Sequence, residues 1–304
     1  MSSRACRAYA PFLFVGLLAA LAAPAFAQIL LDSTEELAWN RPEAWAMKYF
    51  TAVSLMSGYG ASEGLDKGAI SIAFDVGCVP NLDEDERRVG FIGSKVEDLN
   101  RTSAFGRVRA DFGLPSNWTL TLGWVPPLEI DGVTPEVYNL ALSRRLISRS
   151  NWSLSARVHG QAGSLEGDLT CPAAIVDSTD PAVNPEECLE PSRDQVTMDY
   201  AGIEWTYTRT ASNRWHPYLA VSANYLDLEF QVRARYSLFL DRGRLLADGW
   251  SPTLAIGTRY LGRSKLTLAG EVFYAPLAVM RESARASQND PLINVRFLIE
   301  YRVR

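Results

Sequence analysis

The side chains with the greatest capacity for chemistry are arginines and carboxylates that alternate with apolar residues along short segments. In the segment 103–112, Arg107, Arg109 and Asp111 occupy every second position. A period of two puts these charges on one face of a strand and the apolar residues on the other. Because buried ionisable groups must pair or meet water, the charged face predicts either an aqueous passage or a paired ionic core. Over the whole chain, this face comprises Lys48, Asp75, Arg107, Arg109, Asp111, Arg145, Arg157, Glu204, Arg259, Glu271, Arg296, Glu300 and Arg302.

An aqueous passage lined in this way favours small polar or anionic solutes. The charged face holds eight basic and five acidic residues, although the net charge of the chain is −5. Charge inside a confined passage sets the local ion concentration, whereas distant surface charge is screened within about 10 Å. If the arginines instead pair with Glu204, Glu271 and Asp111, the interior conducts nothing. Small residues in the same phase favour the open passage: Ala52, Ala73, Gly123, Ala141, Gly202, Ala220, Ala255, Gly257 and Ala269.

The remaining reactive side chains do not form a catalytic or metal-binding pattern. His159 and His216 are the only histidines, and neither has a partner at metal-ligand spacing. His159 lies on the same face of its strand as Arg157. It therefore points away from the opposite, apolar face, where a lipid-modifying enzyme would need it to reach a lipid ester. No glycine loop suited to phosphate binding is present. The sequence therefore predicts no enzyme, no cofactor and no metal, and its acidic charge argues against nucleic acid as a partner.

The alternating segments predict an all-β fold with about 12 strands, and 10 to 14 strands are compatible with the pattern. The segment 88–96 is the least regular, because it contains two glycines and reads equally well as part of a long loop. It is counted as a strand to keep the number even. The expected strands are 45–55, 70–76, 88–96, 103–112, 118–125, 137–146, 152–162, 196–208, 215–225, 250–261, 265–275 and 292–303.

The connections between these strands alternate between short and long. Short turns follow Phe112, Leu146, Thr208 and Leu261, and long connections occupy 126–136, 163–195, 226–249 and 276–291. Tight turns at one mouth and long loops at the other predict an antiparallel transmembrane β-barrel with short periplasmic turns and long extracellular loops. Trp118, Trp152 and Trp215 lie just past short turns, which predicts an aromatic girdle at one membrane interface.

The first 27 residues have the layout of a secretory signal peptide, with two arginines, an apolar run and an A-x-A site that predicts cleavage after Ala27. Residues 28–44 lack a period and are expected to be a periplasmic leader or a short plug, and residues 45–304 are expected to form the barrel. Cys171 and Cys188 lie in an acidic, proline-rich segment, and an exported protein can keep a disulfide between them. Cys78 is expected to be a small residue at a strand end.

With these features the chain resembles Gram-negative outer-membrane β-barrel proteins as a class. Its last strand supplies the alternating apolar residues typical of the class, although Arg304 ends the chain where an aromatic residue is usual. The resemblance implies an outer-membrane location, contact with outer-membrane lipid and lipopolysaccharide, and assembly by the barrel-assembly machinery. The leading functional hypothesis is a passive channel or a small-solute uptake barrel. The alternative is a non-conducting structural or adhesion barrel that works through its outer loops, and a lipid-modifying enzyme ranks third.

Overall fold

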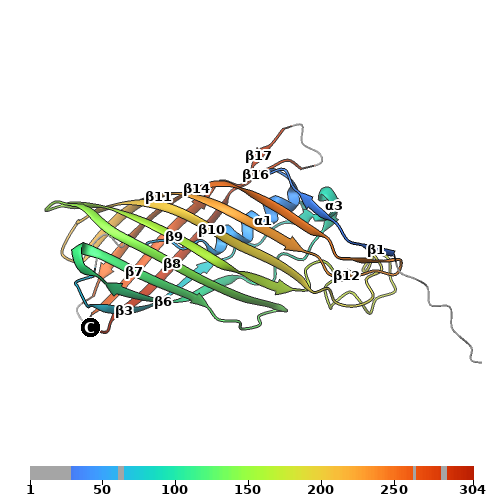
Figure 1. The fold of residues 1–304 in the computed structure, drawn as a ribbon, viewed down its shortest axis with the longest axis horizontal. Helices are drawn as coiled ribbons and strands as arrows, with labels where there is room; N and C mark the ends of the chain where they lie inside the picture. Colours follow the sequence, from blue (N-terminus) through green and yellow to red (C-terminus); the bar gives the residue numbers. More distant parts are fainter. Residues whose placement is uncertain (1–28, 61–64, 263–264, 282–285) are drawn as a thin grey trace, which may run out of the picture.

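Ten antiparallel strands close into one barrel in the computed structural model, which describes residues 29–60, 65–262, 265–281 and 286–304. Each strand pairs with the next one along the barrel, and the last strand closes the ring on the first (Figure 1). The barrel strands are β3 (Ile70–Cys78), β6 (Ala104–Gly113), β7 (Trp118–Val125), β8 (Val133–Ser148), β9 (Trp152–Gly167), β10 (Asp194–Arg209), β11 (Trp215–Gln231), β14 (Arg244–Leu261), β15 (Leu266–Ala275) and β18 (Leu292–Arg302).

Ten strands lie within the predicted range of 10 to 14, but the expected number of about 12 is not confirmed. The expected strand 45–55 is wrong, because this segment is the helix α1 (Pro42–Ser54). The expected strand 88–96 is also wrong. It follows the helical turn α2 (Glu84–Arg87) and holds only β4 (Arg88–Val89), the short turn α3 (Gly90–Gly93) and β5 (Lys95–Val96). Gly93 has a positive φ, which a regular strand does not accommodate.

The predicted alternation is present in the barrel wall. In β18, for example, Val295 and Phe297 are exposed on the outer face, whereas Arg296 and Leu298 are buried inside. Near the mouth with the long loops, the longer strands show the reverse pattern, with apolar side chains on the inner face and polar ones on the outer face. In β11, Leu226 is fully buried inside and its neighbour Asp227 is exposed outside. The upper part of the barrel interior is therefore apolar, and the lower part is charged.

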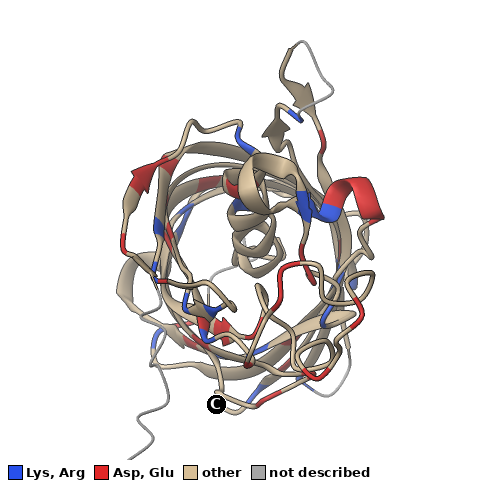
Figure 2. Ribbon diagram, turned by 90° about the vertical axis from the view of Figure 1, so that its right-hand side faces the viewer, with Lys and Arg blue, Asp and Glu red and all other residues tan. Residues whose placement is uncertain are grey.

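The chain enters the barrel at the long-loop mouth. The strand β1 (Ile29–Leu31) pairs in parallel with β13 (Phe239–Asp241), which in turn pairs with β12 (Ala234–Arg235), all at that mouth. The strand β2 (Thr34–Glu36) pairs with the start of β14. From there α1 runs inside the ring of strands, as the view along the barrel shows (Figure 2). The wall begins only at β3, whose first residue lies beside the C-terminal residue Arg304 at the short-turn mouth.

The connections are short at one mouth and long at the other, as predicted, but the longer strands shorten three of the long connections to residues 126–132, 168–193 and 232–243. The turn between β6 and β7 is η1 (Pro115–Asn117), where Ser116 and Asn117 have positive φ. One long connection contains the pair β16 (Ala278–Val279) and β17 (Gln288–Asn289). Another contains the predicted disulfide between Cys171 and Cys188, whose Cα atoms are 5.8 Å apart. Cys78 is exposed at the end of β3.

Within the described ranges, no helix has the length and apolar character needed to cross a membrane.

Candidate functional site

Five arginines of the barrel wall converge on one short stretch of backbone, the end of α1 and the residues that follow it. Five of the seven arginines that the sequence assigned to the inward face take part, whereas Arg145 lies beside a register shift of β8 and Arg302 is exposed at the end of β18. Arg296 donates to the carbonyl oxygens of Ala52 and Leu55 at 2.8 and 2.7 Å. The other four bonds are Arg107 to Ser54 at 3.1 Å, Arg157 to Met56, Arg109 to Ser57 at 3.0 Å and Arg259 to Tyr59 at 3.4 Å. We call these five residues the arginine clamp.

The clamp sits where a helix most needs donors. The last four carbonyl groups of an α-helix have no partner within the helix, and the partial negative charge of the helix dipole lies at the same end. Arg296 brings both hydrogen-bond donors and a positive charge to this end of the helix, and its guanidinium also approaches the carbonyl of Val53 at 3.4 Å. The same guanidinium stacks on the ring of Phe273. The wall thereby holds the end of α1 by charge-assisted hydrogen bonds, which are stronger than neutral ones.

The candidate carboxylates of the inward face neutralise the clamp or tie it to the plug. Arg157 pairs with Glu204 at 2.7 Å, and Glu271 accepts hydrogen bonds from Ser57 and Tyr218. Asp111 accepts a hydrogen bond from Thr121. Three further ion pairs complete the set, in which Asp75 contacts Arg107 and Arg109 at 3.3 Å and Glu300 contacts Arg259 at 2.8 Å. Of the two interiors that the sequence allows, the structure contains the paired ionic core.

The small residues of the inward face pack against the inserted segment. Ala220 and Ala255 belong to one buried cluster with Ala52 of α1, whereas Ala73 and Ala269 surround Tyr59. These positions were expected to leave room for a passage, and in the structure that room holds the plug. We use "plug" for residues 37–60.

The upper end of α1 is tied to the long loops. The ammonium group of Lys48, which was expected on a strand, donates to the carbonyls of Trp39 at 2.6 Å and Ala278 at 2.7 Å. The indole of Trp45 donates to Asp290 at 3.1 Å, and the hydroxyl of Tyr49 donates to Pro80 at 2.6 Å. Nothing in the local sequence indicated these contacts, since each partner lies in a distant loop or is a backbone carbonyl.

Two cavities lie along one face of α1 in the apolar part of the barrel near the long-loop mouth. Cavity A, of about 260 Å³, lies towards the long-loop mouth and is lined by residues such as Met47, Phe230 and Leu245. Cavity B, of about 270 Å³, lies further along the same face of the helix, where Phe50, Val53 and Ser54 line it. Three side chains line both cavities and form the partition between them: Phe50, Leu99 and Leu169.

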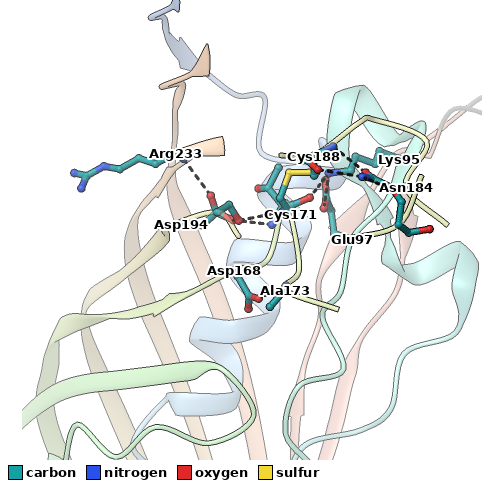
Figure 3. Close-up of a disulfide and its surroundings, with 12 residues drawn as sticks. Lys95, Glu97, Asp168, Cys171, Ala173, Asn184, Cys188, Asp194 and Arg233 are labelled. Atoms are coloured by element: carbon teal, nitrogen blue, oxygen red, sulfur yellow. Dashed lines mark hydrogen bonds and ion pairs between the residues drawn. A yellow bond between two sulfur atoms is a disulfide. The ribbon is translucent and has the colours of Figure 1, made fainter. Parts of the chain in front are cut away.

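The disulfide loop packs beside cavity A at the long-loop mouth. Lys95 donates to the carbonyl of Thr170 next to Cys171, and it also pairs with Glu97 at 3.1 Å (Figure 3). Burial raises the pKa of the Glu97 carboxyl to about 7. Asn184 bridges the loop by bonding both backbone groups of Cys188.

Both histidines are buried in the barrel interior. His159 is buried, and its Nε2 is 2.9 Å from the side-chain oxygen of Asn224. His216 is buried on β11. Among the described residues, no group of three His, Cys, Asp or Glu side chains is placed to hold a metal ion.

The predicted girdle tryptophans lie on the outer face near the short turns. Trp152 stacks on Tyr207 with ring centroids 5.8 Å apart, and Trp215 packs against Tyr260 at 5.0 Å. The guanidinium of Arg144 covers Trp118. A second aromatic group lies nearer the long-loop mouth and comprises Trp124, Tyr138, Tyr225 and Trp250. On β11 the two groups are ten residues apart, which on a strand tilted by roughly 45° spans the apolar band of about 25 Å found in such barrels.

A closed antiparallel barrel with apolar residues outside and charged residues inside defines a protein of the Gram-negative outer-membrane β-barrel class. The structure is similar to an outer-membrane channel from Pseudomonas putida F1, with 8% identity, a TM-score of 0.44, and coverage of 82% of this chain and 99% of that one. It is also similar to the toluene transporter TbuX of Ralstonia pickettii, with 10% identity, a TM-score of 0.32, and coverage of 86% and 94%. A third similar structure is the outer membrane protease OmpT of Escherichia coli, with 9% identity, a TM-score of 0.38, and coverage of 77% and 94%. No family model and no curated protein sequence matches the chain.

Proposed function

We propose that the protein is an outer-membrane uptake barrel for small, neutral, apolar solutes, with the plug closing its axis to ions. The observation that carries the proposal is the pair of cavities A and B, which meet at the partition of Phe50, Leu99 and Leu169. Binding sites for small molecules are concave, mostly apolar and largely pre-formed. Each cavity is slightly smaller than the roughly 300 to 1,000 Å³ of drug-sized sites, which favours a small solute.

The nature of the interior favours an apolar solute over the polar or anionic one that the charge count suggested. The arginines of the clamp already bond to carboxylates and to plug carbonyls, so they are not a row of free cations along a water-filled path. The space beside α1 is bordered mostly by apolar side chains, although Glu35, Arg41, Glu43, Glu97 and Asp241 also line cavity A. We expect the purified, refolded protein to show little steady ion conductance in planar bilayers while the plug is in place.

Cavity A faces the long loops, which we propose to be extracellular, and solute entry from outside fits this placement. Export by a signal peptide cleaved after Ala27, assembly by the barrel-assembly machinery and contact with lipopolysaccharide remain predictions that accompany this orientation. The short turns then face the periplasm.

The test is the entry of N-phenyl-1-naphthylamine, a neutral dye that fluoresces when it reaches the bilayer, into intact Gram-negative cells that produce the protein. We expect faster entry than in cells without it. Leu169→Trp fills the partition and should slow entry, whereas Leu219→Trp on the exposed outer face of β11 should not. Heat-dependent gel mobility checks that both variants are folded.

Entry that is the same with and without the protein would refute uptake of apolar solutes. It would favour the alternative of a closed barrel that works through its outer loops. Steady ion conductance in the wild type would instead favour a passive channel for polar solutes and would contradict the proposed role of the plug.

A further inference from the structure

We propose that the solute leaves the barrel sideways, into the outer leaflet of the membrane, through a gap in the wall between β6 and β8. The inference rests on the proposed uptake function and adds the exit route. It starts from the uneven height of the wall, because β3, β6 and β7 have 8 to 10 residues each, whereas β8 to β11 have 16 or 17.

The gap arises where β7 ends too early to fill the space between its neighbours. The pairing of β6 with β7 stops at Val108 and Trp124, and the residues of β6 above it, 104–107, pair only with β3. On the other side the pairing of β7 with β8 stops at Val125 and Val137. Above it, residues 134–136 pair only with β9, and Val133 also forms an isolated bridge with Ile130. Pro126 and Pro127 follow Val125 directly, and since proline has no N–H to donate, β7 ends there.

Cavity B lies at this gap and is bordered by both faces of the wall. From inside, Phe50 of α1 and Met198 of β10 line it. From outside, Phe74 and Val108 line it, and both are more than 40% exposed on the outer face. A cavity whose lining includes inward and outward residues is continuous with the surroundings of the barrel.

The outer surface around the gap suits contact with lipid. Leu128 and Ile130, in the loop beyond β7, are exposed next to it. On the tall side of the wall, the outward residue two positions beyond Tyr225 is Asp227 instead. The apolar surface therefore extends further on the short side, where the gap lies at the edge of the apolar band next to Trp124.

The other exit, along the barrel axis, is unsuited to an apolar molecule. Below the partition it would have to pass the arginine clamp and its carboxylates, where a molecule without polar groups would break hydrogen bonds and replace none. Cavity C, near the short-turn mouth, is lined by charged residues such as Arg109, Asp111 and Arg302. The lining of cavity B on the sideways route is mostly apolar, and its charged members are Arg101, Arg107 and Glu166.

The experiment compares three tryptophan substitutions in the dye-entry assay. Ala104→Trp adds bulk on the outer face of β6 at cavity B. Ala110→Trp is its matched control, because Ala110 has the same orientation on the same strand but lies where β6 is paired with β7. Thr267→Trp adds bulk in cavity C, on the axial route.

We expect Ala104→Trp to slow dye entry several-fold, and Ala110→Trp and Thr267→Trp to leave the rate unchanged. A slower rate in Thr267→Trp together with a normal rate in Ala104→Trp would overturn the sideways route in favour of the axial one. Wild-type rates of dye entry in all three variants would also overturn the sideways route, provided that the wild-type protein accelerates entry and Leu169→Trp slows it. Absence of entry in the wild type would instead refute the uptake function itself.

Discussion

Replacing Arg296 by methionine should loosen the plug while leaving the barrel wall closed. Arg296 is buried, and among the described residues its side chain donates to the carbonyl groups of Ala52, Val53 and Leu55. Methionine keeps an unbranched apolar stem that can lie along Phe273 but offers no donor. The substitution therefore leaves carbonyl groups at the negative end of the helix dipole without their partner, in a place that water does not reach.

The expected cost follows from these contacts. Hydrogen bonds to charged groups contribute about 1.5 to 3 kcal/mol each, and two of the three distances are short. Removing the arginine also relieves the cost of burying its charge, but Glu271 then loses a nearby cation. Loss of one partner from a buried ionic arrangement typically costs about 3 to 5 kcal/mol, which we take as the expected change in the free energy of opening of α1.

Hydrogen exchange on the refolded protein measures this opening. With about 1.4 kcal/mol for each factor of ten, the slow amides of α1 should exchange roughly 10²- to 4 × 10³-fold faster in Arg296→Met. Amides of β10 and β11 should keep their protection. Arg302→Met, on the same strand but exposed, is the control and should leave α1 unchanged. Unchanged exchange of α1 in Arg296→Met would refute the clamp, and loss of protection throughout the wall would show that Arg296 holds the barrel instead of the helix.

Three further outcomes test the long-loop mouth. The Glu97 carboxyl has a raised pKa of about 7, so the folded state binds its proton more tightly than the unfolded state. The stability of the hairpin 88–96 should therefore fall as pH rises from about 4.5 to 7 and level off above pH 7. Hydrogen exchange, corrected for the intrinsic effect of pH on the exchange rate, measures this stability, and Glu97→Gln should abolish its pH dependence. Removing the disulfide by replacing Cys171 and Cys188 with alanine should destabilise its loop by about 3 kcal/mol and expose it to limited proteolysis, and equal cleavage rates would contradict this. Thr179→Cys should react with an impermeant maleimide on intact cells and Ala211→Cys should not, and the reverse result would invert the proposed orientation.

The barrel strands could be predicted because their two faces meet different surroundings. Where one face is apolar and the other charged, as in β6 and β18, a period of two is unmistakable. The prediction stopped short at the long-loop mouth, where β11 continues to Gln231 although its expected end was 225. There the interior is apolar and Asp227 points outward, so the contrast reverses and the pattern no longer marks the strand.

The helix α1 could not be predicted by the same reasoning. It is enclosed by the wall on all sides, and a helix that is buried all round has no apolar stripe to reveal its period. Its alternating Met47, Tyr49 and Val53 resemble a strand, but the intervening Phe50 is apolar too. The local signals that do favour a helix are Pro42 in its first turn and its several alanines.

The clamp shows why a count of inward charges could not separate an open passage from a filled one. The phase of Arg107, Arg157 and Arg296 was evident from the sequence, but the partners that decide their role are backbone carbonyls, which every residue carries. Those carbonyls come from a segment up to 244 positions away in the chain. A wall that offered the same arginines to water would have the same alternation. The difference lies in whether a helix of the same chain lies inside the barrel, and only the three-dimensional arrangement shows that it does.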